Sequence, residues 1–151
     1  LLALARQGIS ATDPEAVALD ALAGRCWETV ETSDATLSIE TEQVVRADRS
    51  RLRQLLENLF RNAVEHGGPG VHIVVGDLDT GFYVADDGSG IPADEREQVF
   101  ETGYSTTSAG TGFGLGIVAR VAEAHGWTVN VTESTDGGAR FEVKGVERAA
   151  V

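Results

Sequence analysis

Two asparagines one helical turn apart have the type and spacing to hold a ligand. Asn58 and Asn62 lie in the run 51–66, where apolar residues recur at three- and four-residue steps and predict an amphipathic helix. Asparagine is a weak helix former, so the pair, with Glu65 and His66, predicts a polar row that meets a ligand. An amide oxygen suits Mg²⁺, which is held by few protein oxygens plus water and phosphate. A solvated helix face is the alternative reading.

A second candidate is an aspartate at the end of a predicted strand. Residues 82–85 are apolar and β-branched or aromatic, and they run into Asp86 and a turn that contains Gly88 and Gly90. Glycine permits positive φ and lets a ligand lie against bare backbone. The Asp86 carboxylate is therefore suited to accept a hydrogen bond from an amino group deep in a pocket. An aspartate that merely opens a glycine turn is the alternative.

The same turn also fits the G-x-G-x-x-A dinucleotide pattern over residues 88–93. That motif requires a long helix and a second parallel strand, whereas residues 94–100 allow only about two helical turns. Asp86 and Asp87 would also face a pyrophosphate of like charge. We therefore reject a dinucleotide site.

A third element is the glycine-rich run 110–116, which leads into helical spacing of apolar residues and a glycine cap at Gly126. A glycine loop at a helix N-terminus presents free N–H groups that suit phosphate. Because Lys144 is the only lysine, a P-loop is excluded, and backbone, hydroxyls and metal must hold the phosphates. The polar run 101–109 between the glycine turns is predicted to be a mobile lid.

Taken in order, these segments resemble the catalytic, ATP-binding domain of two-component sensor histidine kinases. This domain belongs to a wider ATPase family with DNA gyrase, mismatch-repair ATPases and a heat-shock chaperone. The resemblance begins near Asp13 and rests on five boxes: the N-box at 57–63, the G1 box at 86–92, the F-box region at 99–103, the G2 box at 110–115 and a closing glycine and phenylalanine motif at 137–141. Each box alone is a weak signal, and their order is a strong one.

The resemblance implies an α+β fold, a two-layer Bergerat sandwich with helices on one face of a mixed sheet, and it implies ATP and Mg²⁺ as ligands. It implies that Asn62 coordinates Mg²⁺, that Asn58 helps to position nucleotide and metal, and that Asp86 reads the adenine amine. The further nucleotide contacts that it implies are His66, Gly88, Gly90, Ile91, Thr111, Gly112, Phe113, Gly114 and Leu115.

The chain departs from the family pattern after the second asparagine. Kinases of this family often carry a basic residue three positions on and an aromatic residue next to it, where this chain has Glu65 and His66. The usual basic phosphate contact is therefore absent or comes from elsewhere, with Arg61 as one candidate. His66 is a candidate for stacking on adenine.

The same box bears on the reaction. Gyrase-like relatives place a water-activating glutamate where this chain has Asn58, and Glu57 lies about 100° away around the helix. We therefore expect phosphotransfer, with positioning and metal electrostatics supplying most of the catalysis. A gyrase-like ATPase and a nucleotide-binding interaction module without kinase activity remain as alternatives.

The resemblance also sets the expected domain organisation and partners. Residues 1–12 are expected to be the tail of a dimerisation hairpin and a linker, and residues 13–151 the catalytic domain. Residues 1–8 contain no histidine, so the phosphoacceptor histidine is expected upstream, in a longer homodimeric protein that passes the phosphoryl group to the receiver domain of a response regulator.

Composition narrows the class further. A formal net charge of −12 makes nucleic-acid binding unfavourable, and no apolar run is long enough to span a membrane. The single cysteine, Cys26, excludes an internal disulfide and favours a cytoplasmic setting, although the full-length protein could carry a membrane anchor. The acidic, lysine-poor composition resembles that of proteins from organisms with high internal salt. His72 and His125 are expected to be structural.

The expected order of elements starts with a helix opened by Asp13 and Pro14, which are good cap and first-turn residues. Strands follow near 36–39, 43–45, 71–75 and 82–85, with the N-box helix between the second and third. A short helix at 94–100, the lid, the helix after the G2 box and a hairpin of 127–132 with 139–146 complete the chain.

Overall fold

The computed structural model describes residues 13–30, 34–91, 94, 115–134 and 137–149. Several predictions fall outside these residues: the hairpin tail at 1–12, the short helix after Asp94, the lid, and the phosphate-loop residues Thr111, Gly112, Phe113 and Gly114.

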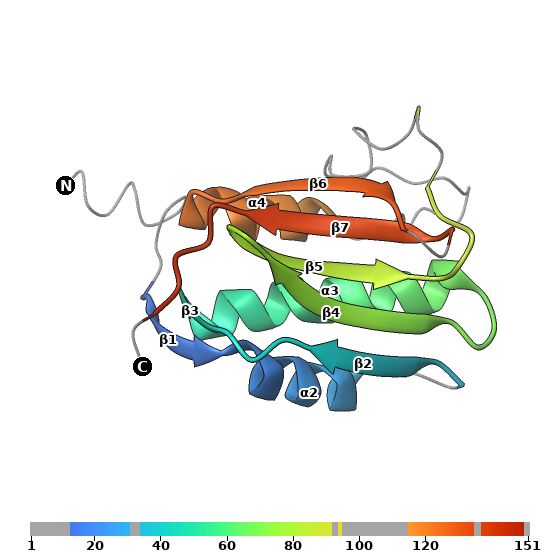
Figure 1. Cartoon of the computed structure of the whole chain (residues 1–151), viewed down its shortest axis with the longest axis horizontal. Coiled ribbons are helices and arrows are strands. Elements are labelled where there is room, and N and C mark those ends of the chain that lie inside the picture. Colours follow the sequence, from blue (N-terminus) through green and yellow to red (C-terminus); the bar gives the residue numbers. More distant parts are fainter. Residues whose placement is uncertain (1–12, 31–33, 92–93, 95–114, 135–136, 150–151) are drawn as a thin grey trace.

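A five-stranded sheet forms one layer of the molecule (Figure 1). Its strand order is β2-β4-β5-β7-β6, and the pairing of β2 with β4 is parallel whereas the other pairings are antiparallel. The predicted mixed sheet is therefore confirmed. The strands are β2 (Thr36–Glu40), β4 (His72–Leu78), β5 (Gly81–Asp86), β6 (Thr128–Glu133) and β7 (Ala139–Lys144).

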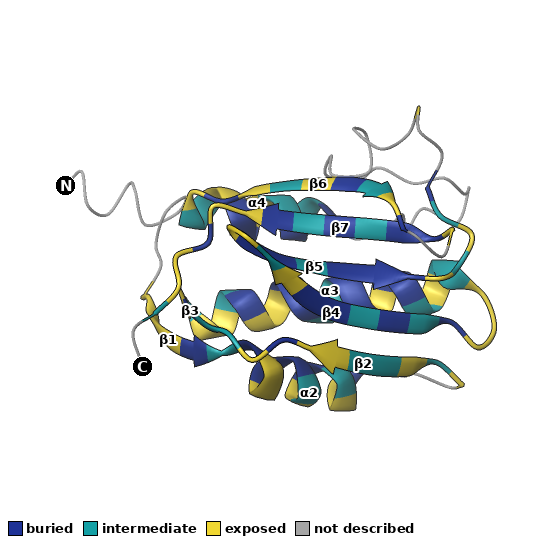
Figure 2. Ribbon diagram, viewed as in Figure 1, coloured by how far each residue is buried: buried dark blue, intermediate teal, exposed yellow. Residues whose placement is uncertain are grey.

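Helices form the second layer. Helices α3 (Arg49–Gly67) and α4 (Leu115–His125) lie against one face of the sheet, and α2 (Leu19–Thr29) packs beside α3 (Figure 1). The core between the layers contains Phe60 of α3, Phe82 of β5 and Phe141 of β7, and the dark blue side of α3 in Figure 2 faces it. The predicted two-layer α+β fold and the amphipathic N-box helix are confirmed.

The chain begins differently from the prediction. No helix starts at Asp13 and Pro14, because residues Glu15–Ala18 form strand β1, which pairs antiparallel with β3 (Val44–Ala47) in a separate two-stranded sheet. Tertiary pairing overrides the local preference for a helix cap at this position. In the paired strands Val17 of β1 is completely buried, and it lies opposite Val45. Helix α2 then starts without a side-chain cap.

His72 and His125 make structural contacts, as predicted. The His72 ring bonds the hydroxyls of Thr36 and Ser38, which ties β4 to β2. His125, the last residue of α4, stacks on Trp127 with ring centroids 4.1 Å apart. The predicted cap Gly126 follows, with φ at +77°. Among the described helices, none is both long and apolar enough to cross a membrane.

Candidate functional site

One pocket brings together residues that the sequence analysis selected from separate segments. It lies where the last turn of α3 meets the end of β5 and the start of β7. Five of its lining residues were predicted: Asn62, His66, Asp86, Gly90 and Ile91. The others are Ala63, Gly67 and Ala139.

Asn62 is buried, which contradicts the alternative reading of a solvated helix face at this position. The residue is 3% exposed, and within the described residues its Oδ1 accepts no hydrogen bond. A buried acceptor without a partner costs about 1 to 3 kcal/mol, and most such atoms in folded proteins are satisfied. Asn62 lines the pocket, so a bound ligand or metal is a partner that the chemistry of this oxygen fits.

Asn58 lies one turn earlier on α3 and is only half-buried. Its Nδ2 donates a hydrogen bond of 2.7 Å to the backbone oxygen of Gln54, which fixes the amide and leaves Oδ1 as the atom for a ligand. Asn58 does not belong to the pocket lining within the described residues. The two asparagines therefore have different environments in spite of their shared face.

Asp86 is a buried carboxylate held by two backbone groups. It is 7% exposed, and Oδ1 accepts hydrogen bonds from the N–H groups of Gly88 at 2.9 Å and Ala139 at 3.2 Å. Burial raises the pKa of Asp86 above its usual value, and the two hydrogen bonds counteract this only in part. Because both bonds use Oδ1, Oδ2 is the oxygen suited to a ligand's donor.

Two residues that support Asp86 were not selected from the sequence. Ala139 supplies the N–H described above, and a Cβ on Gly138 would overlap the backbone and Oδ1 of Asp86. The paired glycines at 137–138 were noted only as part of a motif. Their signal was the need for bare backbone beside a side chain from another strand.

The glycine turn after Asp86 packs on the end of α3. A Cβ on Gly88 would overlap the backbone of Gly67, and Ser89 Oγ donates to the backbone oxygen of His66 at 3.1 Å. Gly90 has φ at +77°, in the left-handed region that favours glycine. Gly88 therefore supports the turn by close packing, whereas Gly90 lines the pocket.

Glu57 points away from this pocket. Its Oε2 accepts hydrogen bonds from Thr29 Oγ1 of α2 at 2.9 Å and from Arg53 Nε at 3.1 Å. Burial, followed by the nearby charge of Glu57, raises the pKa of the Cys26 thiol on α2 to about 12. Glu57 is thus a contact between α2 and α3.

The remaining described candidates, Leu115, Glu65 and Arg61, lie outside the lining of this pocket. Leu115 is buried in the core as the first residue of α4, and its contact with nucleotide stays a prediction. Glu65 and Arg61 are exposed on α3, and neither belongs to the described lining of the pocket. The basic contact proposed for Arg61 is therefore without support from this pocket.

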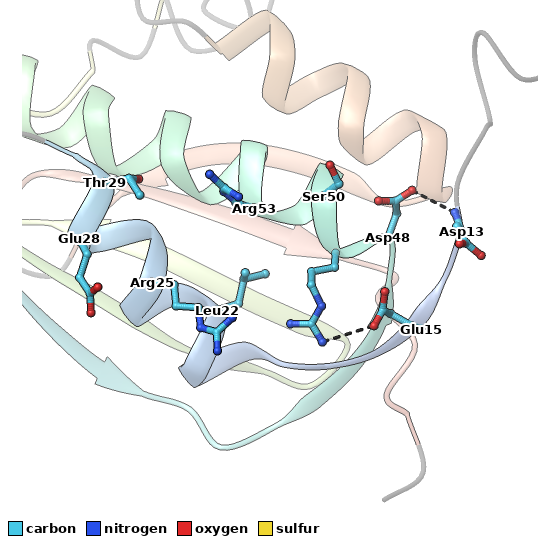
Figure 3. A pocket seen from close by; sticks show the side chains of 10 residues that line it. Asp13, Glu15, Leu22, Arg25, Glu28, Thr29, Asp48, Ser50 and Arg53 are labelled. Atoms are coloured by element: carbon cyan, nitrogen blue, oxygen red, sulfur yellow. Dashed lines mark hydrogen bonds and ion pairs between the residues drawn. The ribbon is translucent and has the colours of Figure 1, made fainter.

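A second, larger cavity of about 710 Å³ lies at the opposite end of α3 (Figure 3). Its walls come from α2, from Asp13 and Glu15, and from Asp48 and the first two turns of α3. Arginine and carboxylate side chains alternate around it, including the ion pair of Arg49 with Glu15 at 3.4 Å. Of the asparagine, glycine and aspartate candidates that the structure describes, none lines it.

An asparagine-bearing helix over a mixed sheet, with a buried aspartate at a strand end and a glycine turn, defines a class of nucleotide-binding ATPases. Residues 47–147 match the family of histidine kinase-, DNA gyrase B-, and HSP90-like ATPases, and the chain belongs to this family.

The chain is similar in sequence to sensor kinases. It is 38% identical over 106 residues to sensor histidine kinase ZraS of Escherichia coli O157:H7, an alignment that covers 68% of this chain and 23% of ZraS. It is 41% identical over 96 residues to sensor-type histidine kinase PrrB of Mycobacterium leprae (strain TN), covering 60% of this chain and 22% of PrrB. The chain thus spans less than a quarter of the length of these relatives.

Solved structures share the fold. The mycobacterial sensor histidine kinase MprB superposes with a TM-score of 0.73 at 28% identity, covering 91% of this chain and 97% of that chain. Full-length ShkA in complex with AMPPNP gives 0.74 at 30% identity, covering 99% and 35%. The ATP binding domain of PrrB from Mycobacterium tuberculosis gives 0.66 at 30% identity, covering 91% and 99%.

Proposed function

We propose that this chain is the ATP-binding catalytic domain of a two-component sensor histidine kinase. It binds Mg-ATP and transfers the γ-phosphoryl group to a histidine outside this chain, from which a response regulator's receiver domain takes it. The observation that carries the proposal is the orphaned Oδ1 of buried Asn62 in the same pocket as the Asp86 carboxylate. Family membership and the AMPPNP bound to ShkA support ATP as the nucleotide.

The base end of the site is assigned to Asp86. Its Oδ2 accepts a hydrogen bond from the adenine amino group, while the backbone bonds to Oδ1 hold the carboxylate in place. Gly90 and Ile91 form the wall against which the base lies, and the half-buried His66 stacks from the side of α3. A carboxylate selects adenine over a base that presents an oxygen at that position.

The metal end is assigned to Asn62, whose buried oxygen fits a Mg²⁺ ligand. Asn58, fixed by its bond to Gln54, orients the phosphates from the previous turn. When bound, Mg²⁺ supplies neutralisation of the charge that develops on the phosphates. Thr111, Gly112, Phe113 and Gly114 are assigned to the phosphates on sequence alone.

The proposal favours transfer over hydrolysis. A hydrolytic ATPase needs a residue that orients and deprotonates water, and Glu57 is occupied between Thr29 and Arg53 on the side of α2. Asn58 occupies the position where gyrase-like relatives place their glutamate, and an amide is not a base. The acceptor in this reaction is therefore an imidazole nitrogen, delivered in cis or in trans by a helical hairpin of a homodimer.

We place the domain in the cytoplasm and propose that it works at high internal salt. Repulsion within a chain of formal net charge −12 destabilises the compact state, and salt screens it. The melting temperature should therefore rise as the Debye length falls from about 10 Å at ~0.1 M salt to about 3 Å at ~1 M. Calorimetric melting across this range tests the adaptation, and a melting temperature that falls with sodium chloride would contradict it.

The test of function is a phosphorylation assay on the full-length protein that contains this chain. With ATP labelled on the γ-phosphate, we expect labelled protein whose phosphate is lost in acid and kept in base, as phosphohistidine behaves. Asn62→Ala should remove the label, and Asn130→Ala, a change to an exposed asparagine on β6, should keep it. Release of labelled phosphate to water without labelled protein would show an ATPase and refute the proposal.

A further inference from the structure

Asp48 lies at a point where three parts of the described chain meet. It is the N-cap of α3, with Oδ1 accepting a hydrogen bond of 3.2 Å from the N–H of Arg51. Its Oδ2 accepts a second bond, of 3.0 Å, from the N–H of Asp13, where the chain enters the domain (Figure 3). Its own N–H donates a bond of 3.0 Å to Nε2 of His125.

Each of these contacts leads to a different region. Asp13 precedes β1, which pairs with β3, the strand that runs directly into Asp48. His125 ends α4, and its Nδ1 donates to the backbone oxygen of Val121 at 2.8 Å, which fixes the ring so that Nε2 accepts. Asp48 therefore ties the segment before β1 to α3, which lines the nucleotide pocket, and to the end of α4.

The Asp48 carboxylate accepts more hydrogen bonds than capping α3 requires. Partial burial alone would raise the pKa of Asp48, but N–H groups of Asp13, Arg51 and Ser50 and the charge of Arg51 lower it below its usual value. A carboxylate that accepts bonds from two separate segments holds both in one geometry. The nearby ion pair of Arg49 with Glu15 is exposed and adds little.

We propose that Asp48 is a positioning residue that sets how the chain preceding the domain joins α3, and so aims the nucleotide site at the histidine. This rests on the proposed function, because it assumes an acceptor upstream of Asp13. Asp48 lies 14 positions before Asn62 on one uninterrupted helix, about 21 Å away, so it does not touch the nucleotide. A displacement of about 1 Å between two reacting groups can cost about 100-fold in rate. If the contact between Asp48 and Asp13 is lost, we therefore expect slower phosphoryl transfer to the histidine with unchanged nucleotide affinity.

The test separates the two roles of the Asp48 side chain, which caps α3 through Arg51 and holds Asp13. In Asp48→Asn the side chain has a single acceptor oxygen, so it can satisfy Arg51 or Asp13 but not both. In Asp48→Ser the short hydroxyl caps α3 but does not reach Asp13. Asparagine and serine are both good N-caps, so each variant should fold. Asp20→Asn, at an exposed first-turn aspartate of α2, is the matched control for the lost charge.

Full-length wild type and variants are compared for ADP affinity by calorimetry and for the rate of self-phosphorylation at saturating ATP. We expect both Asp48 variants to keep the ADP affinity and to lose about tenfold in phosphorylation rate, with the Asp20 control unchanged. An unchanged rate, or a rate that falls only in step with ADP affinity or with the melting temperature, would overturn the inference. A wild type that binds ADP but labels no histidine would instead overturn the proposed function, and with it this inference.

Discussion

The two ends of α3 are built in opposite ways. At the N-terminal end, the Asp48 carboxylate accepts hydrogen bonds from Asp13 and from Arg51 of α3, and its own N–H donates to His125 of α4. At the C-terminal end, Asn62 is buried with an acceptor that has no partner among the described residues. The first end contributes to stability without a ligand, whereas the second carries a cost that a ligand removes. One helix thus joins a completed structural contact to an incomplete binding site.

The largest effect is expected on the binding side, at Asp86. In Asp86→Asn the amide oxygen at the Oδ1 position keeps both bonds, from Gly88 and Ala139, but the NH₂ group replaces Oδ2 and meets the adenine amine as a second donor. We expect about a 100-fold loss of ADP affinity in calorimetric titration. Asp79→Asn, an exposed change in the turn between β4 and β5, should bind as wild type does.

The Asp86→Asn variant also tests what the Asp86 carboxylate contributes to the free energy of unfolding. The pKa of Asp86 is raised by burial, so the ionised carboxylate costs folding free energy at neutral pH, and this cost vanishes as pH falls below the unfolded value. Asp86→Asn should therefore unfold in urea at pH 7 no earlier than wild type. A large loss of stability together with the loss of binding would show that Asp86 is a framework residue.

The next effect concerns the contact of the glycine turn with the end of α3. Gly88→Ala places a Cβ into the backbone of Gly67, which should lower the free energy of unfolding by about 1 to 3 kcal/mol. Gly24→Ala on α2 is the matched control, because its nearest neighbour is Ile39 Cδ1 at 4.0 Å. That change should stabilise by up to about 1 kcal/mol in urea unfolding, since alanine is the better helix former. Equal effects of the two substitutions would contradict the packing described for Gly88.

A smaller effect on stability is expected at the other end of the helix. Asp48→Ala should lower the free energy of unfolding by about 1 kcal/mol, as loss of an N-cap does. Because the pKa of Asp48 is lowered in the folded state, its contribution is present above the unfolded value and is lost as pH falls through the folded value. Urea unfolding at pH 7 and at acidic pH should therefore show a difference between wild type and variant that shrinks in acid. A difference independent of pH would contradict this role for the carboxylate.

Most of the helices and strands could be predicted from the sequence, and the features that were missed all depend on long-range contacts. The apolar spacing of α3 and the alternation and flanking glycines of the strands are local signals, and the structure confirms those elements. Strand β1 was missed because its pairing with β3 is a long-range contact that overrides the cap signal at Asp13.

The sequence predicted which residues form the site, but not how deeply each is buried or which neighbours it contacts. The boxes indicated that Asn62 and Asp86 belong to one site, yet spacing alone left a ligand-facing row and a solvated helix face as alternatives for Asn62. Its burial depends on how α3 meets β5, which helical periodicity does not encode. Gly138 and Ala139 were missed for the same reason, because they act on a side chain 52 and 53 positions away, across neighbouring strands.

The central claim is that the unpaired oxygen of Asn62 exists for a metal-bound nucleotide. The most direct test titrates ADP into wild type, Asn62→Ala and the control Asn130→Ala, each with and without Mg²⁺, while urea unfolding follows stability without ligand. We predict that wild type and Asn130→Ala bind more tightly with Mg²⁺, that Asn62→Ala loses this dependence, and that its stability does not fall, because an orphaned group has been removed. Mg²⁺-dependent binding that survives in Asn62→Ala would contradict the account.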